Sequence, residues 1–134
     1  MSHCLDTNTV IYYLKGSYPG LAARLRSVPP RRIVVPEIVR AELLYGVAKS
    51  RDTERNRQRV EAFLAPLTLL PFAGAAVEHY ADIRADLERR GELIGPNDLI
   101  VAATCRAHGA TLVSRNTGEF SRVTGLQVVD WTNA

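Results

Sequence analysis

Short apolar runs separated by amphipathic stretches dominate the pattern of hydrophobic and polar positions in this sequence. The strand-like runs are 2–5, 32–35, 68–71, 110–114 and 126–129. Nearly all of these runs are apolar on both faces, which is typical of strands in a parallel sheet that is covered on both sides. The pattern therefore predicts a buried parallel sheet.

Stretches with helical periodicity fill the intervals between these runs. They cover 9–14, 19–26, 36–49, 53–64, 74–90 and 97–107. Pro36 and Pro96 stand where a first helical turn needs no N–H donor, and Gly91 and Gly109 follow helix ends. Strands that alternate with helices predict an α/β fold, an α/β/α sandwich around a mostly parallel sheet of four to five strands.

The chain shows no linker, internal repeat or low-complexity segment, so we expect residues 1–134 to form a single domain. Cys4 and Cys105 lie in apolar surroundings without metal-ligand spacing, which favours buried thiols in a reducing compartment. No signal peptide or membrane-length apolar segment is evident. We therefore expect a soluble, cytoplasmic protein with no membrane partner.

The formal net charge is only +3, from 17 Lys and Arg against 14 Asp and Glu, which does not by itself indicate a nucleic-acid partner. Arginine makes up 15 of the 17 basic residues. Its planar fork suits carboxylates and phosphates, although an Arg-rich proteome gives the same ratio. The composition therefore does not indicate which kind of molecule this protein binds.

Three acids occupy positions where a merely solvated acid is not expected. Asp6 follows the first strand, at the sheet edge where open parallel sheets bind ligands, or it simply caps the next helix. Glu42 shares a helix face with apolar and small residues, which requires a cation or a buried arginine as partner. Asp98 lies in the first turn of an apolar helix, facing a cleft or simply the helix dipole.

A second polar group follows the strand-like run that ends at Ser114. A doubly wound sheet of order 3-2-1-4-5 would place Ser114 and Asn116 beside Asp6. Asn116 would then face a metal-held water or a phosphate, and Glu119 would reach the same site; the alternatives are an Asx turn or N-cap for Asn116 and a solvated position for Glu119. Carboxylates that converge without His or Cys favour Mg²⁺ or Mn²⁺. His3, His79 and His108 share no ligand spacing, so we expect structural or surface roles.

Four segments, taken in order, resemble the motifs of PIN-domain ribonucleases, and in particular the VapC toxins of bacterial toxin–antitoxin pairs. The segments are 5–9 (LDTNT), 35–46 (VPEIVRAELLYG), 94–103 (IGPNDLIVAA) and 112–120 (LVSRNTGEF). The resemblance extends over essentially the whole chain and implies a PIN-like α/β/α fold. It also implies Mg²⁺- or Mn²⁺-dependent endonucleolytic cleavage of RNA, often a structured RNA such as a tRNA. A VapB-type antitoxin, a homodimer and a higher assembly with the antitoxin are implied as well.

Carried over position by position, the resemblance assigns Asp6, Glu42 and Asp98 as catalytic and metal-binding acids. Many members have a fourth aspartate where this chain has Asn116, so Asn116 and Glu119 are further metal-site candidates. The candidate substrate-binding residues are Thr7, Asn8, Ser114, Arg115 and Asn116. The antitoxin would cover apolar helix positions and place a basic side chain near the acids; core burial explains the same positions equally well. These positions are Ile11, Tyr12, Leu14, Leu43, Leu44 and Val47.

The basic stretch 49–59 either binds RNA or is an ordinary solvated helix, and Arg115 is a stronger phosphate-binding candidate than the distant Arg122. Two other functions are compatible with parts of the sequence. The run from Asp6 to Val10 resembles the nucleophile loop of haloacid-dehalogenase-type phosphatases, but Asn8 replaces its second aspartate. A PIN-like binding module with a decayed site is the other alternative, and Asn116 is the feature in its favour.

Overall fold

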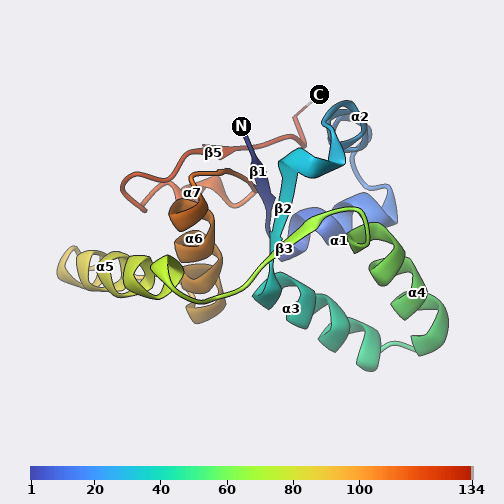
Figure 1. The fold of residues 1–134 in the computed structure, drawn as a ribbon, viewed down its shortest axis with the longest axis horizontal. Coiled ribbons are helices and arrows are strands. Elements are labelled where there is room, and N and C mark those ends of the chain that lie inside the picture. Colours follow the sequence, from blue (N-terminus) through green and yellow to red (C-terminus); the bar gives the residue numbers. More distant parts are fainter. Residues whose placement is uncertain (134) are drawn as a thin grey trace.

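The computed structural model describes residues 1–133 and places a five-stranded sheet at the centre (Figure 1). The strand order is β3-β2-β1-β4-β5, and every neighbouring pair is parallel. The strands are β1 (His3–Leu5), β2 (Ile33–Pro36), β3 (Thr68–Leu70), β4 (Thr111–Val113) and β5 (Val128–Val129). The predicted parallel sheet is confirmed, and its strand order is the doubly wound one that was considered for placing Ser114 and Asn116 beside Asp6.

Helices cover both faces of the sheet, with α5 and α6 on one side of the strands and α1, α2 and α4 on the other (Figure 1). Their bounds are α1 (Thr7–Lys15), α2 (Pro19–Ser27), α3 (Glu37–Ala48), α4 (Thr53–Leu64), α5 (Ala75–Arg89), α6 (Pro96–His108) and α7 (Thr117–Phe120). The 3-10 helix η1 (Pro30–Arg32) precedes β2. The α/β/α sandwich is confirmed; η1 and α7 were not predicted because each is too short to show a helical period.

Local sequence signals fix the ends of the helices that lead to the sheet edge. The Asp6 carboxylate caps α1, and Gly16 ends that helix with a positive φ of 67°. Pro96 occupies the first turn of α6, and Gly109 ends it at φ 72°. These limits bring the first turns of α1 and α6 to defined positions beside the strands.

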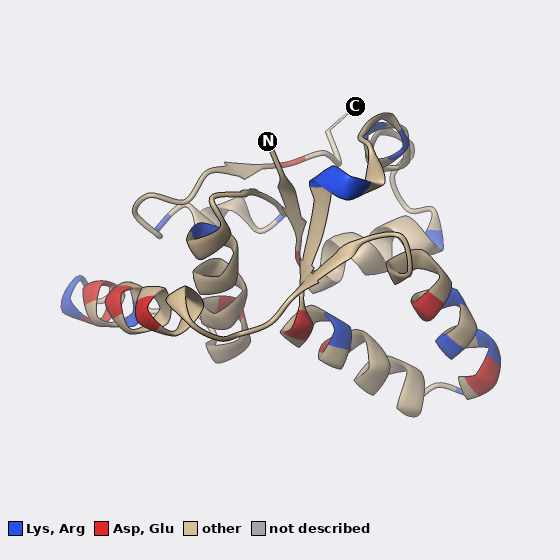
Figure 2. Ribbon diagram, viewed as in Figure 1, with Lys and Arg blue, Asp and Glu red and all other residues tan. Residues whose placement is uncertain are grey.

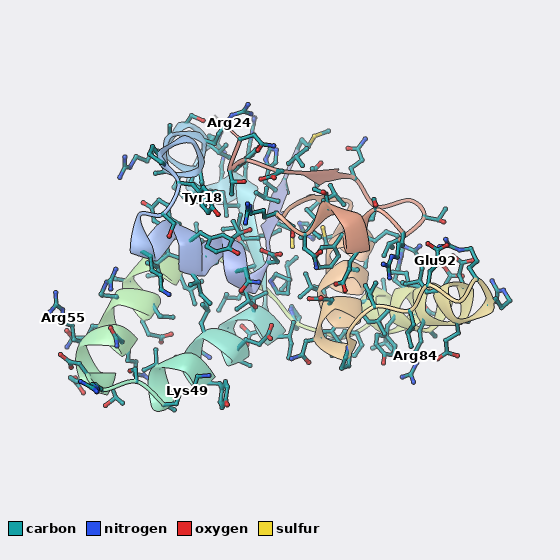
Figure 3. All side chains as sticks on the ribbon, turned by 180° about the vertical axis from the view of Figure 1, so that it is seen from behind. Tyr18, Arg24, Lys49, Arg55, Arg84 and Glu92 are labelled. Carbon is teal, nitrogen blue, oxygen red and sulfur yellow. The ribbon has the colours of Figure 1, made fainter. Side chains whose placement is uncertain are left out.

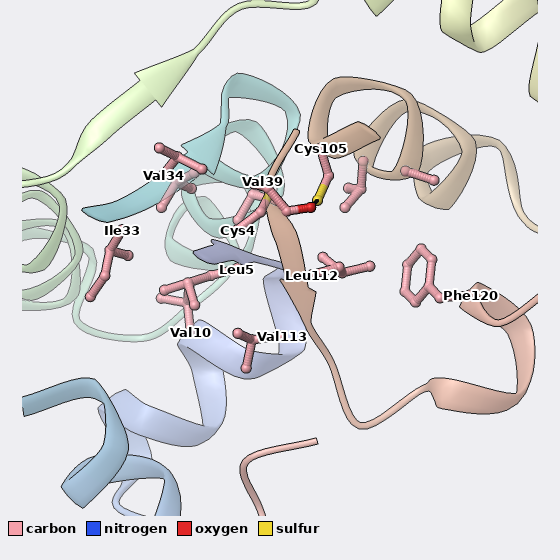
Figure 4. Close-up of a cluster of buried hydrophobic side chains, with 14 of the residues drawn as sticks. Cys4, Leu5, Val10, Ile33, Val34, Val39, Cys105, Leu112, Val113 and Phe120 are labelled. Atoms are coloured by element: carbon pink, nitrogen blue, oxygen red, sulfur yellow. Dashed lines mark hydrogen bonds between the residues drawn. The ribbon is translucent and has the colours of Figure 1, made fainter. Parts of the chain in front are cut away.

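The core lies on both sides of the three interior strands. Leu5, Val35 and Leu112 have no exposed surface, whereas the edge strands β3 and β5 are only partly buried. Figure 4 shows Cys4, Leu5, Leu112, Val113 and Phe120 within this apolar cluster. The interior strands therefore form a rigid base for the polar residues that follow their carboxyl ends.

Both cysteines are buried and free, as predicted. The Cys105 thiol donates to the carbonyl oxygen of Ala110 at 3.3 Å, next to the start of β4. Burial, followed by the neighbouring Cys105 thiol, raises the pKa of the Cys4 thiol well above its ordinary value. These thiols behave as small packed side chains.

Within residues 1–133, no helix is both long enough and apolar enough to cross a lipid bilayer.

Candidate active site

Asp6 is the first residue after β1 and is 7% exposed. One carboxylate oxygen accepts from the backbone N–H of Thr9 at 2.9 Å, and the other accepts from the hydroxyl of Ser114 at 2.6 Å. Both interpretations made from the sequence therefore hold: Asp6 caps α1, and it lies at the edge of the sheet where ligands bind. Each oxygen keeps a further lone pair for another partner.

The segment after β4 is joined to the start of α1, as the strand order predicted. The Thr9 hydroxyl donates to the carbonyl oxygen of Val113 at 3.0 Å. The backbone N–H of Asn116 donates to the Ser114 hydroxyl oxygen at 2.9 Å, so Ser114 links Asp6 to the loop that leads into α7. The Asp6 side chain is thereby held by Ser114, which lies more than a hundred positions further along the sequence.

Glu42 reaches the same region from α3 and is half-buried. Its two carboxylate oxygens accept from the Thr7 hydroxyl at 2.6 Å and from the Asn97 amide at 3.2 Å. The alternative of a buried Glu–Arg pair is wrong for this residue, because Glu42 has no ion-pair partner in the part of the chain that the structure describes. Arg40, two residues earlier, pairs with Glu61 at 3.2 Å instead.

The burial predicted for the Glu42 face needs correction. Tyr45, one helical turn along α3, is 66% exposed, so this flank of α3 borders solvent rather than the core. Glu42 also lines a cavity of about 380 Å³ between α1, α3 and α4. Tyr45 belongs to the helix face that Glu42 shares, and the spacing alone does not show that this face is exposed there, because a tyrosine is compatible with either environment.

Asp98 carries the clearest electrostatic sign that the acids converge. Burial raises the pKa of Asp98 to about 6, with further contributions from a hydrogen bond to Glu119 and from repulsion by Glu119, Asp6 and Glu42. The four carboxylates come from the end of β1, from α3, from the first turn of α6 and from α7. Segments far apart in the sequence thus contribute to one acidic cluster.

Asn116 acts on this cluster through Glu119. Its side-chain amide donates to the Glu119 carboxylate at 2.7 Å. Asn116 occupies the N-cap position of α7 without making a side-chain cap bond, and it is exposed. The amide therefore orients Glu119, and the prediction that Glu119 reaches the site of the other acids agrees with its contact to Asp98.

The cluster is loose in this structure. Over the described range 1–133, no three His, Cys, Asp or Glu side chains stand close enough to enclose an ion directly. Mg²⁺ commonly keeps several water ligands and contacts only one or two carboxylates, so a loose acidic site fits a hydrated hard cation. It does not fit a structural zinc site, which has four close ligands, typically from Cys and His.

The remaining candidates divide into residues near the acids and residues elsewhere. Asn8 and Arg115 are exposed beside Asp6, and the Arg115 guanidinium lies 5.4 Å from the centre of the Tyr18 ring. Arg122 donates to backbone carbonyls of the 92–93 segment, so it is bound away from the acids. His79 accepts from Arg106 at 2.8 Å, in agreement with a structural role.

Sequence reasoning missed Asn97 and Tyr18 as members of the site. Asn97 holds Glu42 across the cleft, and its signal was its place beside Asp98 in the first turn of an apolar helix. Tyr18 precedes α2 and had no chemical signal in the sequence, because only the fold brings its ring to Arg115 and Tyr12.

Comparisons with known proteins identify the family of this chain. The family model described as "PIN domain" matches residues 3–126. Ribonuclease VapC2 of Haemophilus influenzae is 39% identical over 131 residues, which cover 98% of both chains, and the tRNA(fMet)-specific endonuclease VapC of Shigella flexneri is 35% identical over 96% of both. The solved structure of VapBC2 from Rickettsia felis, bound to a promoter DNA fragment, matches with a TM-score of 0.91 and 34% identity over 98% of this chain and 99% of that one. With its four acids at the edge of a parallel sheet, this chain belongs to the PIN-domain family and, within it, to the VapC ribonucleases.

Proposed function

We propose that this chain is the toxin of a toxin–antitoxin pair and that it hydrolyses RNA phosphodiester bonds at the acidic cluster with Mg²⁺ or Mn²⁺. The observation that carries the proposal is the unneutralised charge of this cluster. Although the chain has 15 arginines, Asp6, Glu42, Asp98 and Glu119 form no ion pair among residues 1–133. Partly buried acids that repel one another favour a divalent cation.

The proposed metal-holding side chains are Asp6, Glu42 and Asp98, with Glu119 completing the set. A divalent cation bound there would activate water and stabilise charge on the phosphate that is attacked. The chain's own task is orientation: Ser114 and the Thr9 N–H fix Asp6, and Thr7 and Asn97 fix Glu42. Such supporting hydrogen bonds keep carboxylates aimed at a cation.

The distribution of unpaired arginines supports an RNA substrate. The arginines of α5 and α6 pair with acids, and Figure 2 shows the resulting mixture of charges on α5. The exposed arginines of α2, η1 and α4 make no ion pair within the described residues. They are Arg24, Arg26, Arg31, Arg32, Arg55, Arg57 and Arg59, and Arg51, just before α4, is likewise exposed and without an ion pair among these residues. Arg59 also donates to the carbonyl oxygen of Leu14. Exposed guanidinium groups without an acidic partner are available to bind RNA phosphates.

We also propose that a VapB-type antitoxin occupies the groove between α1, α3 and α4. This groove has a volume of about 380 Å³, with an apolar floor that includes Ile11, Leu14, Leu43 and Val47. Glu42 lines it as well, so a basic side chain of a bound segment would reach the acids directly. The homodimer implied by the resemblance stays a prediction. A cytoplasmic location is part of the proposal, since both the RNA and the antitoxin would be met there.

The experiment is 5′-end mapping of total RNA treated with the purified protein. We expect discrete new ends with Mg²⁺ or Mn²⁺, none with EDTA, and recovery when Mn²⁺ is restored. Asp6→Asn and Asp98→Asn should abolish these ends, whereas Glu78→Gln, which removes an exposed acid from α5, should not. Asparagine at position 6 can still cap α1, and thermal unfolding would verify folding of each variant.

Cleavage by Asp6→Asn and Asp98→Asn at the wild-type rate would refute the assignment of the acids. EDTA-sensitive cleavage would exclude a decayed binding module. The phosphatase alternative is contradicted already, because the chain belongs to the PIN-domain family.

A further inference from the structure

A small polar cavity adjoins the acidic cluster. It has a volume of about 210 Å³ and is lined by Asp6, Asn8, Tyr12, Arg115 and Asn116. Asn8 and Tyr12 are four residues apart on α1 and thus share one helix face, while Arg115 and Asn116 come from the segment after β4. The cavity therefore lies between α1 and the β4–α7 connection, directly beside a proposed metal ligand.

Tyr18 holds two walls of this cavity in place. Its ring packs against the Tyr12 ring with centres 5.2 Å apart and planes at 80°, and the Arg115 guanidinium lies 5.4 Å from its centre. Figure 3 shows Tyr18 beside α1. An aromatic ring and a guanidinium that are already fixed offer flat surfaces for stacking at little entropic cost.

The polar groups of the cavity retain hydrogen-bonding capacity. Asn8 is exposed, and its side-chain amide has no hydrogen-bond partner among the described residues, so it offers a donor and an acceptor side by side. Asn116 uses its amide nitrogen on Glu119 and keeps its carbonyl oxygen. Neighbouring donors and acceptors of this kind match the edge of a nucleobase.

We propose that this cavity binds one nucleobase of the substrate, that of the nucleotide next to the phosphate being cleaved. The base stacks on Tyr12, its edge bonds to Asn8, and Arg115 holds an adjacent phosphate. The volume is below the roughly 300 Å³ at which pockets begin to enclose whole drug-sized ligands, which suits a single planar ring system. The inference rests on the proposed ribonuclease function and deepens it by naming a position where base identity is selected.

Selection follows from the amide of Asn8. A base with the wrong pattern of donors and acceptors would cover this amide without forming its hydrogen bonds. Such a mismatch lowers binding affinity more than a small loss of contact area does. Because the cavity touches Asp6, the selected base lies within one nucleotide of the cut.

The test is an NMR titration of the Mg²⁺-loaded protein with AMP, CMP, GMP and UMP, with inorganic phosphate as the comparison. At about 5 mM ligand, where even a millimolar site is mostly filled, one nucleotide should shift the Asn8 side-chain amide and the Tyr12 ring signals more than the others. Phosphate alone should leave these signals in place. If all five ligands leave the Asn8 and Tyr12 signals unmoved, the proposal is overturned.

Variants separate the roles of the two side chains. Tyr12→Leu should weaken the preferred nucleotide about 10-fold, the size expected for loss of one stacking platform. Asn8→Ala, at an exposed position that should not affect folding, should equalise the four nucleotides. Tyr45→Leu, which removes an exposed tyrosine outside the cavity, should bind like the wild type. Unchanged affinity and unchanged base preference in both cavity variants would contradict the proposal.

RNA cleavage distinguishes failure of the subsite from failure of the function. With RNA randomised around the cut, Asn8→Ala should lose base preference at one position only and keep it elsewhere. Cleavage with the same preference in wild type and Asn8→Ala would overturn the subsite and leave the ribonuclease assignment standing. Nucleotide binding at Asn8 and Tyr12 in a wild-type protein that cuts no RNA would support the subsite and refute the proposed reaction.

Discussion

Replacing Asp98 with asparagine should stabilise the metal-free protein at neutral pH. Asp98 is half-buried beside Glu119, Asp6 and Glu42, and this environment raises its pKa from 3.8 to about 6. Between those values the folded protein keeps a proton that the unfolded chain has already lost. The free energy of unfolding therefore falls as the pH rises through this window, and the loss is complete above about pH 6.

The size of the effect follows from the shift. A rise from 3.8 to about 6 corresponds to an upper limit of about 3 kcal/mol of unfolding free energy. Asp98 is only partly buried, so screening by solvent reduces this contribution to about 1 kcal/mol. Asparagine has the same shape without the charge, so the Asp98→Asn variant should lack this part of the pH dependence.

Urea denaturation of EDTA-treated protein from pH 4 to 8 measures the difference. The wild type should lose about 1 kcal/mol relative to Asp98→Asn across this range. Glu78→Gln, which removes an exposed acid from α5, should follow the wild type. Mg²⁺ should then stabilise the wild type at pH 7.5 and stabilise Asp98→Asn much less, because a ligand stabilises only the state that binds it.

Parallel pH profiles for the wild type and Asp98→Asn would refute the reasoning about the acidic cluster. Equal stabilisation of both proteins by Mg²⁺ would refute the assignment of Asp98 to the metal.

Three further predictions concern support of the site, the core and the thiols. Thr7→Val removes the 2.6 Å hydrogen bond to Glu42 and should weaken Mg²⁺ affinity about 10-fold by calorimetry; unchanged affinity would show that Glu42 needs no such support. Leu112→Ala removes a side chain with no exposed surface and should cost about 2–5 kcal/mol in urea denaturation, whereas a loss below about 1 kcal/mol would contradict close packing at β4. Cys4 and Cys105 should resist iodoacetamide in the native protein and react in urea, and rapid native labelling would contradict their burial.

The alternation of apolar runs and amphipathic stretches was sufficient to predict the parallel sheet, whereas its strand order was an assumption that the structure bears out. Buried parallel strands have no polar face to confuse the pattern, and a doubly wound topology then places Asp6 beside Ser114. The short elements η1 and α7 were not predicted because a single helical turn shows no periodic pattern. The exposure of Tyr45 was not predicted because sequence spacing shows which residues share a helix face but not whether another element covers that face.

The candidate acids could be picked out from the sequence because a carboxylate that is buried at a strand end or on an apolar helix is unfavourable unless it has a partner. The residues that hold these acids in place were harder to predict. Thr7 and Ser114 were predicted to bind substrate, which stays a prediction, and the structure adds that both donate hydrogen bonds to carboxylates. Asn97 contacts Glu42 and Tyr18 contacts Arg115, and both contacts join residues that are far apart in the sequence. No sequence spacing could therefore predict them.

The hydrogen bond from Ser114 to Asp6 also affects the order of events during synthesis. Asp6 and Glu42 are synthesised first, and Asp98, Ser114 and Glu119 are added more than 50 residues after Glu42. Non-local parallel pairing forms slowly, and the β1–β4 contact has to wait for its second strand. The acidic centre therefore cannot form on the nascent chain until Ser114 and Glu119 have been synthesised, and any activity of that centre has to wait for them.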